Sequence, residues 1–276
     1  MKGIITRAIS GAIYVAIIVG SLLCHEELVF ATVFSLITAL GVYEFLHMAN
    51  SQNSSLLTKL VDVCGGVILF LSLPLAVAGP GFPALLPFMG YVIVRLILQL
   101  YYANYDAVKS VSLSFMAILY VAFPLAVTAL IYLLFGPIAV LSLLILLWLN
   151  DTGAYCVGCS IGKHRLFERI SPKKSWEGFW GGFFVCIAYG IAIGMWGNSQ
   201  WSLELNAWQW IIVAAAVSVF GTWGDLCESL FKRTVGIKDS GHIIPGHGGI
   251  LDRIDSLLLA APVALIILHY INVLNG

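Results

Sequence analysis

Carboxylates and hydroxyl groups gather in one stretch of this otherwise apolar chain, between residues 224 and 256. Asp225 and Ser229 stand four residues apart, and so lie on one face of a helix. Asp252 and Asp255 stand three apart and do the same. Carboxylates suit Mg²⁺, which takes one or two of them and completes its shell with water and phosphate oxygens. We therefore predict that both pairs converge on a catalytic cation site. Asp225 and Asp252 are the expected metal ligands. Asp255 adds a ligand or supports the others, and Ser229 contributes an oxygen.

Basic side chains suited to phosphate accompany these carboxylates. They are Lys232, Arg233 and Lys238 in the same stretch, and Lys173 and Lys174 in an earlier loop. Because lysine and arginine form charge-assisted hydrogen bonds with phosphate oxygens, we expect the set to hold a polyphosphate, with Lys232 in the catalytic group. Asp151 and Glu177 could close the same site, or could simply pair with Lys173 and Lys174. A topological explanation also stands, since cytoplasmic loops are rich in Lys and Arg without any ligand.

A glycine-rich turn, residues 245–249, separates the two carboxylate pairs. Gly248 and Gly249 permit close approach of the backbone, whose N–H groups could cradle an anion. A tight re-entry into the membrane explains the glycines equally well. His247 is explained as well by a hydrogen-bonded turn as by catalysis.

The composition places these groups in a membrane protein. Of 276 residues, 60% are apolar and 10% are charged, and the mean hydropathy is +0.97, which excludes an ordinary soluble domain. The net charge of zero gives no field for binding nucleic acid, so none is expected as a partner. Nine apolar stretches are long enough to cross a bilayer as helices. They lie near 6–23, 28–48, 59–79, 82–102, 110–134, 136–157, 176–197, 207–227 and 251–273.

We therefore predict an all-α, polytopic bundle of about nine transmembrane helices. Residues 1–135 form about five N-terminal spans, of which the fifth is either one kinked helix or is divided differently. Residues 136–276 form the catalytic region, with cytoplasmic loops at 158–175 and 228–250. With a cytoplasmic N-terminus, the external loops contain no Lys or Arg, as the positive-inside rule requires. This predicts a multi-pass protein of the cytoplasmic (inner) membrane.

Depth also indicates that the carboxylates serve a function. Asp225 lies roughly 27 Å along the eighth predicted span at 1.5 Å per residue, near the cytoplasmic edge of the hydrocarbon. Carboxylates at that depth are costly unless they are paired or bind cations. The structural alternative for Asp225 and Asp252 is a buried ion pair with Arg253 or Lys232.

The stretch as a whole resembles the phosphatidate cytidylyltransferases, or CDP-diacylglycerol synthases. Their signature reads S-x-x-K-R, then K-D, then P-x-H-G-G-x-x-D-R-x-D. Here it is met by Ser229, Lys232, Arg233, Lys238, Asp239, Pro245, His247, Gly248, Gly249, Asp252, Arg253 and Asp255. The resemblance extends upstream to 151–155, 162–164 and 171–178, and so covers about the last 130 residues. Two positions depart from the pattern: Ser175 stands where Thr is common, and Cys159 stands where a basic residue is common.

The resemblance implies the reaction of CTP with phosphatidic acid to give CDP-diacylglycerol and pyrophosphate, in phospholipid biosynthesis. It implies Mg²⁺, with or without a second cation, and a membrane lipid as partner; a homodimer is compatible with it. Its substrate-binding set comprises Arg233, Lys238, Asp239, His247, Gly248, Gly249, Arg253, Lys173, Lys174 and Ser171. Another CTP-dependent lipid enzyme, such as a lipid kinase, is the nearest alternative. An ion-coupled transporter lined by Asp62, Arg95 and Asp151 is disfavoured because most polar residues lie at one edge rather than at the midplane.

The predicted orientation can be tested by labelling. Cysteines introduced singly as Ser202→Cys and Glu168→Cys into a variant without other cysteines should react with an impermeant thiol reagent from opposite sides of the membrane. Labelling of both from the same side would contradict the nine-span arrangement.

Overall fold

The computed structural model describes residues 2–49, 55–102, 106–197, 203, 205–241, 243 and 248–275. Helices make up nearly all of it. In chain order they are α1 (Lys2–Leu23), α2 (Glu27–Ala49), α3 (Leu56–Ala78), α4 (Leu86–Leu100), α5 (Ala107–Ala117), α6 (Phe123–Phe135), α7 (Pro137–Ile161), α8 (Trp176–Trp196), α10 (Ala207–Thr234) and α11 (Leu251–Asn275). A short 3₁₀ helix precedes α4, and the strands β1 (Arg165–Phe167) and β2 (Ser171–Ser175) lie between α7 and α8.

The prediction of a polytopic all-α membrane protein is confirmed. Within the described residues, eight helical runs are long and apolar enough to cross a bilayer, and the apolar part of α1, Ile9–Leu23, is shorter. Two predicted loop boundaries are wrong. Helix α10 continues to Thr234, so the polar residues from 228 onward are helical, and the loop predicted over 228–250 begins at Val235. Helix α7 runs to Ile161, and the loop predicted over 158–175 contains the β1–β2 hairpin.

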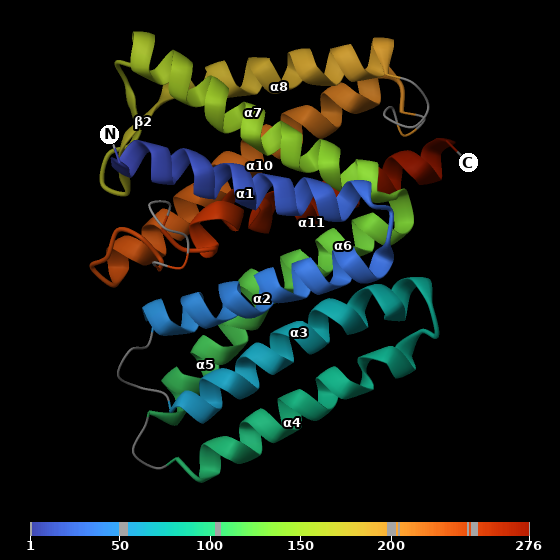
Figure 1. Cartoon of the computed structure of the whole chain (residues 1–276), viewed down its shortest axis with the longest axis vertical. Coiled ribbons are helices and arrows are strands. Elements are labelled where there is room, and N and C mark those ends of the chain that lie inside the picture. The colour runs from blue at the N-terminus through green and yellow to red at the C-terminus, as the bar shows by residue number, and fades with distance from the viewer. Residues whose placement is uncertain are drawn as a thin grey trace. The chain divides into compact units, whose positions relative to one another are not determined.

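The chain divides into two compact units. Unit 1 comprises residues 1–134 and 235–254, and unit 2 comprises residues 135–234 and 255–276. In unit 1, α2, α3 and α4 lie side by side in chain order (Figure 1). Gly66 of α3 lets Val42 of α2 approach, since an added Cβ would lie 2.9 Å from the Val42 side chain. Small residues at such crossings are the usual means by which membrane helices pack closely.

Unit 1 also contains a buried polar cluster formed by α3, α4 and α5. The guanidinium of Arg95 pairs with Asp62 at 3.0 Å, and both side chains are almost wholly buried. Tyr91 and Ser114 donate to the same carboxylate, while Arg95 also donates to Ser110. Because these groups satisfy one another, the cluster is a packed ion pair inside the helices. This cluster gives no support to the alternative in which Asp62 and Arg95 line the pathway of an ion-coupled transporter.

The fifth predicted span is one continuous helical run from Ala107 to Phe135. Its two α-helical parts, α5 and α6, are joined by a π-helical segment over Ile118–Ala122. The chain therefore passes Pro124 without a break, and the division considered from the sequence does not occur.

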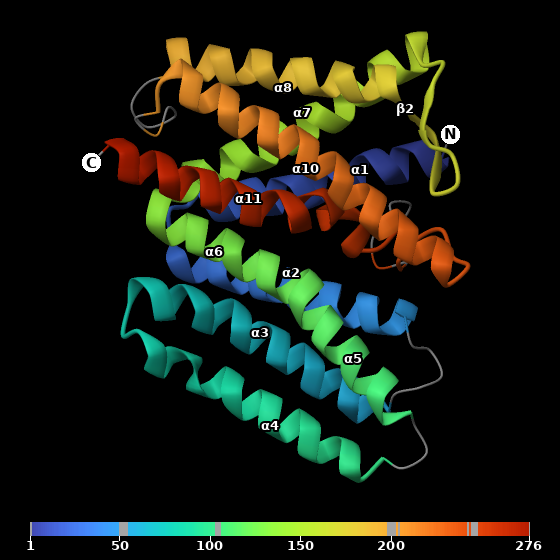
Figure 2. The ribbon, with the colours of Figure 1, turned by 180° about the vertical axis from the view of Figure 1, so that it is seen from behind.

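In unit 2, α8 lies beside both α7 and α10 (Figure 2). Glycines of α8 face the backbone of α7 directly: a Cβ at Gly182 would lie 2.6 Å from the carbonyl oxygen of Asn150, and one at Gly178 would lie 2.8 Å from that of Ala154. The Asn150 side chain donates to Thr222 and accepts from Ser218, both on α10. Close glycine contacts and a buried hydrogen-bond network thus hold α7, α8 and α10 together.

Candidate active site

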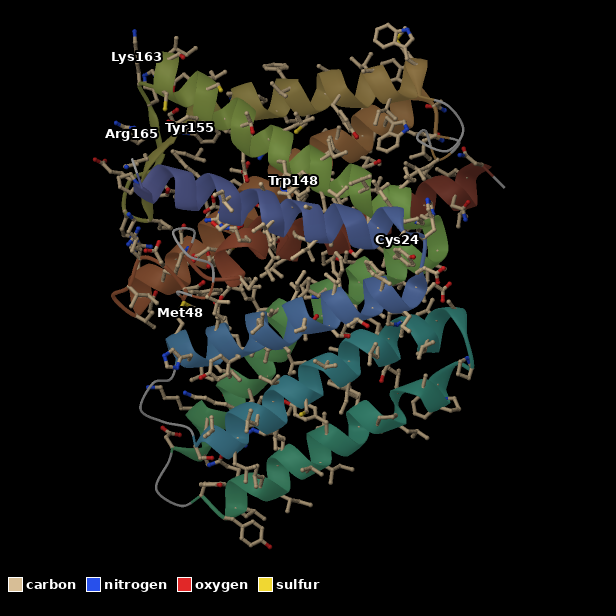
Figure 3. All side chains as sticks on the ribbon, viewed as in Figure 1. Cys24, Met48, Trp148, Tyr155, Lys163 and Arg165 are labelled. Atoms are coloured by element: carbon tan, nitrogen blue, oxygen red, sulfur yellow. The ribbon has the colours of Figure 1, made fainter. Side chains whose placement is uncertain are left out.

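The hairpin β1–β2 connects α7 to α8 and ends in a helix cap. Its strands are antiparallel, with Arg165 opposite Ser175. The hydroxyl of Ser175 accepts a hydrogen bond from the N–H of Gly178 at 3.1 Å and so caps α8. Serine and threonine both cap in this way, which explains why Ser175 can replace the Thr common in the family. Figure 3 shows Lys163 and Arg165 at the end of unit 2 that carries this hairpin.

Three contacts attach the hairpin to α10. The Lys174 ammonium lies 2.6 Å from the Asp225 carboxylate, and the Arg233 guanidinium donates to the carbonyl oxygen of Ile170 at 3.3 Å. The rings of Phe167 and Trp223 meet edge to face at 5.4 Å. The sequence predicts that Lys174 and Arg233 hold one ligand, although they come from separate loops. In the structure they lie on two elements that contact each other, β2 and α10.

The prediction that Asp225 and Ser229 lie on one face of a helix is confirmed. The Ser229 hydroxyl donates to Asp225 Oδ1 at 3.2 Å, one turn along α10. The same helix carries a second pair, in which Lys232 contacts Glu228. Glu228 is fully buried and Lys232 nearly so. The salt-bridge partner of Asp225 is therefore Lys174, rather than the Lys232 considered from the sequence.

Asp255 of α11 joins this group because α10 and α11 touch at Gly224. A Cβ at Gly224 would lie 2.6 Å from the Asp255 carbonyl oxygen. The Asp255 side chain accepts from the N–H of Ser256 at 2.7 Å. Asp225 follows Gly224 along α10, so the contact at Gly224 brings it close to Asp255. Within the described residues, no Lys or Arg forms an ion pair with Asp255.

The donor chemistry of this carboxylate cluster fits a hard cation. Asp225 and Asp255 offer oxygen ligands only, and Mg²⁺ prefers one or two carboxylates together with phosphate and water oxygens. In the part of the chain that the structure describes, no three His, Cys, Asp or Glu side chains are arranged as a ready-made metal site. Mg²⁺ bound by one or two carboxylates completes its shell with water and substrate phosphate oxygens, as it commonly does in nucleotide sites.

Asp252 lies in unit 1, where its carboxylate joins Ser240 to Gly249. It accepts from the backbone N–H of Ser240 at 3.0 Å and from that of Gly249 at 2.8 Å. Gly248 has a φ of +82°, which favours glycine, and a Cβ there would lie 2.6 Å from the Asp252 carboxylate. The turn therefore needs Gly248 both for its backbone angle and for space. The Gly249 amide, predicted to meet an anion, has Asp252 as its acceptor in this structure.

The other predicted substrate-binding residues lie on exposed or partly exposed surfaces. Lys173, Lys238, Asp239 and Arg253 are exposed, and Ser171 is partly buried at the start of β2. Glu177, at the start of α8, accepts from the backbone N–H groups of Lys163 and His164 and from the His164 ring rather than from the lysines of β2. His247 lies outside the described residues.

Two carboxylates near these groups were not assigned from the sequence. Glu228 sits one helical turn from Lys232, a spacing that predicts an ion pair once the helix is known to continue. Glu44 lies in the apolar second span and reaches the turn next to Asp252. An ionisable residue within a span is itself a signal of function, and that rule would have found it.

The fold and the cluster together define a polytopic membrane protein with an oxygen-rich, lysine-bordered site. Comparison with known proteins makes this specific. The cytidylyltransferase family matches residues 5–271, so the chain belongs to that family. It is 47% identical to the phosphatidate cytidylyltransferase of Staphylococcus epidermidis and 46% identical to those of Staphylococcus haemolyticus and Staphylococcus aureus. Each alignment covers 124 residues, 45% of this chain and 46% of the relative, and so spans about half the length of each relative.

The contact at Gly224 can be tested by adding one methyl group. Gly224→Ala should lower the free energy of unfolding by about 1–3 kcal/mol, because the Cβ meets backbone atoms of Asp255 and Ser256 that cannot turn aside. Gly90→Ala is the matched control, since a Cβ at this exposed helical position meets nothing within 4 Å. Thermal unfolding of both variants in detergent makes the comparison. Equal midpoints for the two would show that α10 and α11 are not in close contact at Gly224.

Proposed function

We propose that this chain transfers the cytidylyl group of CTP to phosphatidic acid, forming CDP-diacylglycerol and pyrophosphate. The observation that carries the proposal is the grouping of Lys174, Asp225 and Asp255 where β2, α10 and α11 meet, in a membrane protein of the cytidylyltransferase family. The names of the aligned relatives support the same substrate. The cluster belongs to the cytoplasmic side of the inner membrane, where the positive-inside rule puts the basic hairpin and where CTP is available. A homodimer remains compatible with this proposal.

The reaction calls for charge neutralisation and positioning. A phosphate oxygen of the lipid attacks the α-phosphorus of CTP, a new P–O bond forms, and the bond from that phosphorus to the β-phosphate oxygen breaks to release pyrophosphate. Both reactants are anionic, so they must be brought together against their repulsion. Lys173 and Lys174 on β2 and Arg233 on α10 supply positive charge for the phosphates. The exposure of Lys173 and Arg233 leaves them accessible to a nucleotide from water.

Lys174 has a second task, which its contact with Asp225 suggests. While that lysine is paired with Asp225, it neutralises a carboxylate that would otherwise face Asp255 and Glu228. The side chains of Lys174 and Asp225 are 27% and 28% exposed, so water screens the pair and separating it costs little. Lys174 can therefore leave Asp225 for a phosphate oxygen. Asp225 is then released for its role at the reaction centre.

The carboxylates of Asp225 and Asp255 would hold Mg²⁺. The sequence predicts Asp252 as a further ligand of this ion. When bound, the cation neutralises phosphate charge and favours attack at phosphorus. The buried Glu228–Lys232 pair lies on the same stretch of α10 as Asp225 and Ser229, and Lys232 is partnered there by Glu228.

The substrate assignment can be tested directly. Purified protein given CTP, Mg²⁺ and phosphatidic acid should yield CDP-diacylglycerol and pyrophosphate, identified by mass. The same protein given diacylglycerol should not phosphorylate it. Phosphorylation of diacylglycerol without cytidylyl transfer would instead identify a lipid kinase.

The role of the carboxylates can be separated from a structural one by Asp225→Asn and Asp252→Asn. Each change keeps size and hydrogen bonding but removes charge needed for a cation, so turnover should fall by at least about a hundredfold while the protein still inserts and purifies. Glu168→Gln, at an exposed position of the hairpin turn, is the control and should keep normal turnover.

Turnover, Mg²⁺ dependence and thermal stability are measured on the same preparations. If Asp225 only balances Lys174, its loss should change stability by less than about 1 kcal/mol and leave turnover near normal, because the pair is partly exposed. A well-folded Asp252→Asn enzyme with near-normal turnover at low Mg²⁺ would refute the assignment of Asp252 as a metal ligand.

A further inference from the structure

Glu44 is a buried carboxylate in the middle of unit 1 that no part of the proposed reaction uses. It lies on α2, and the residue is 3% exposed. Its Oε2 accepts a hydrogen bond from the backbone N–H of Leu251 at 2.8 Å and another from the Ser240 hydroxyl at 3.3 Å. These donors lie about 200 residues further along the chain, on either side of the glycine-rich turn. One side chain of α2 therefore binds a residue before that turn and a residue after it.

Two glycines, Gly241 and Gly249, leave room for this carboxylate. A Cβ at Gly241 would lie 2.5 Å from Glu44 Oε1, and a Cβ at Gly249 would overlap Glu44 Oε2 and the Ser240 hydroxyl. Within the described residues, Oε1 has no hydrogen-bond partner. The backbone thus covers both oxygens of Glu44, while hydrogen bonds satisfy one of them.

The energetics of this contact argue against an incidental role. An ionised carboxylate inside an apolar helix is costly unless donors or positive charge reach it. Leu251 is the first residue of α11, so its N–H is one of the free donors at the helix N-terminus, where the helix dipole favours negative charge. Glu44 therefore caps α11 from a helix distant in sequence. An apolar residue at position 44 would avoid the cost of burial but would leave the Leu251 and Ser240 donors unsatisfied.

We propose that Glu44 is a positioning residue, which holds Ser240, Gly249 and the first residue of α11 in the arrangement that the transfer reaction requires. The inference rests on the proposed function for its activity readout. Between the two anchored donors lie Gly248 and Gly249, and Asp252 follows in the first turn of α11. Asp252 closes the turn from within, through Ser240 and Gly249, and Glu44 fixes it to α2. Loss of Glu44 frees the turn without removing any group predicted to touch substrate.

The test compares Glu44→Leu with Glu44→Gln. Leucine fills a similar volume but accepts no hydrogen bond, whereas glutamine can place its carbonyl oxygen at Oε2 and accept from both donors. We expect Glu44→Leu to lower kcat and to raise the KM for CTP. The ratio kcat/KM should fall roughly tenfold or more, which is the size of effect that loss of hydrogen bonds to a charged group produces. Glu44→Gln should restore kcat/KM to within about threefold of wild type. Glu27→Gln, at the exposed start of α2, is the matched control and should leave both constants unchanged.

Hydrogen–deuterium exchange gives a readout that does not depend on activity. In Glu44→Leu, peptides covering 238–254 should exchange faster than in wild type, while peptides from α3 and α8 should not change. Glu44→Gln should show wild-type protection. Ser240→Ala removes one of the two donors and should give an intermediate effect. Its effect should be largely absent in the Glu44→Leu background, because the two side chains act on one contact.

The outcomes separate the positioning role from the proposed function. If wild type shows no cytidylyl transfer, the proposed function fails, and the exchange pattern alone still decides whether Glu44 holds the turn. Normal exchange and normal kinetics in Glu44→Leu would overturn the positioning role. So would a Glu44→Gln variant as inactive as Glu44→Leu but with wild-type protection, since that result would require the charge itself. If Glu44→Leu does not fold, the Ser240→Ala and Glu44→Gln variants are compared instead. Normal hydrogen exchange and normal kinetics in Ser240→Ala would then overturn the proposal.

Discussion

A carboxylate surrounded by apolar helices is stable only where a donor or a positive charge reaches it, and much of this fold follows from that constraint. In unit 2, the hairpin brings Lys174 to Asp225, and Lys232 reaches Glu228 from the next turn of α10. In unit 1, Glu44 is met by a backbone amide and a hydroxyl from the segment 235–254. Segments that look like loops in the sequence are therefore structural partners of buried charge.

Glycine residues make close contacts between these segments possible, either because they leave space or because they allow an unusual backbone angle. At Gly224 and Gly182 the backbone of a neighbouring helix occupies the space of a side chain. At Gly248 the backbone angle excludes most other residues. At Gly249 the space is filled by the Glu44 carboxylate and the Ser240 hydroxyl. The glycine-rich signature of the family is thus explained here by packing and backbone geometry, before any ligand is considered.

Sequence patterns predicted those features that depend on local spacing. The apolar stretches located the helices, and the four-residue interval placed Ser229 and Asp225 on one face of a helix, where they are hydrogen-bonded. The end of α10 was misplaced because the polar residues after 227 read as loop, although Glu228 and Lys232 are themselves spaced as a helical pair. The choice of Lys174 as the partner of Asp225 depends on the register of a hairpin that was not predicted. Glu44 is a single charged residue in an apolar helix, so no sequence spacing indicates which residues it contacts.

The π-helical segment over Ile118–Ala122 has a consequence for how this chain tolerates insertions and deletions during evolution. A π-turn accommodates one residue more than an α-turn, and each residue of an α-helix rotates the chain by about 100°. The segment thus sets the rotation between α5, whose Ser110 and Ser114 meet the Arg95–Asp62 pair, and the apolar, deeply buried α6. Removal of a single residue there would restore a regular α-helix and keep both faces in register, because the π-turn holds the extra residue locally. Removal of a residue from α5 or α6 would instead rotate one face by about 100° away from its partners. A one-residue deletion is therefore tolerated better in this segment than in the helices on either side of it.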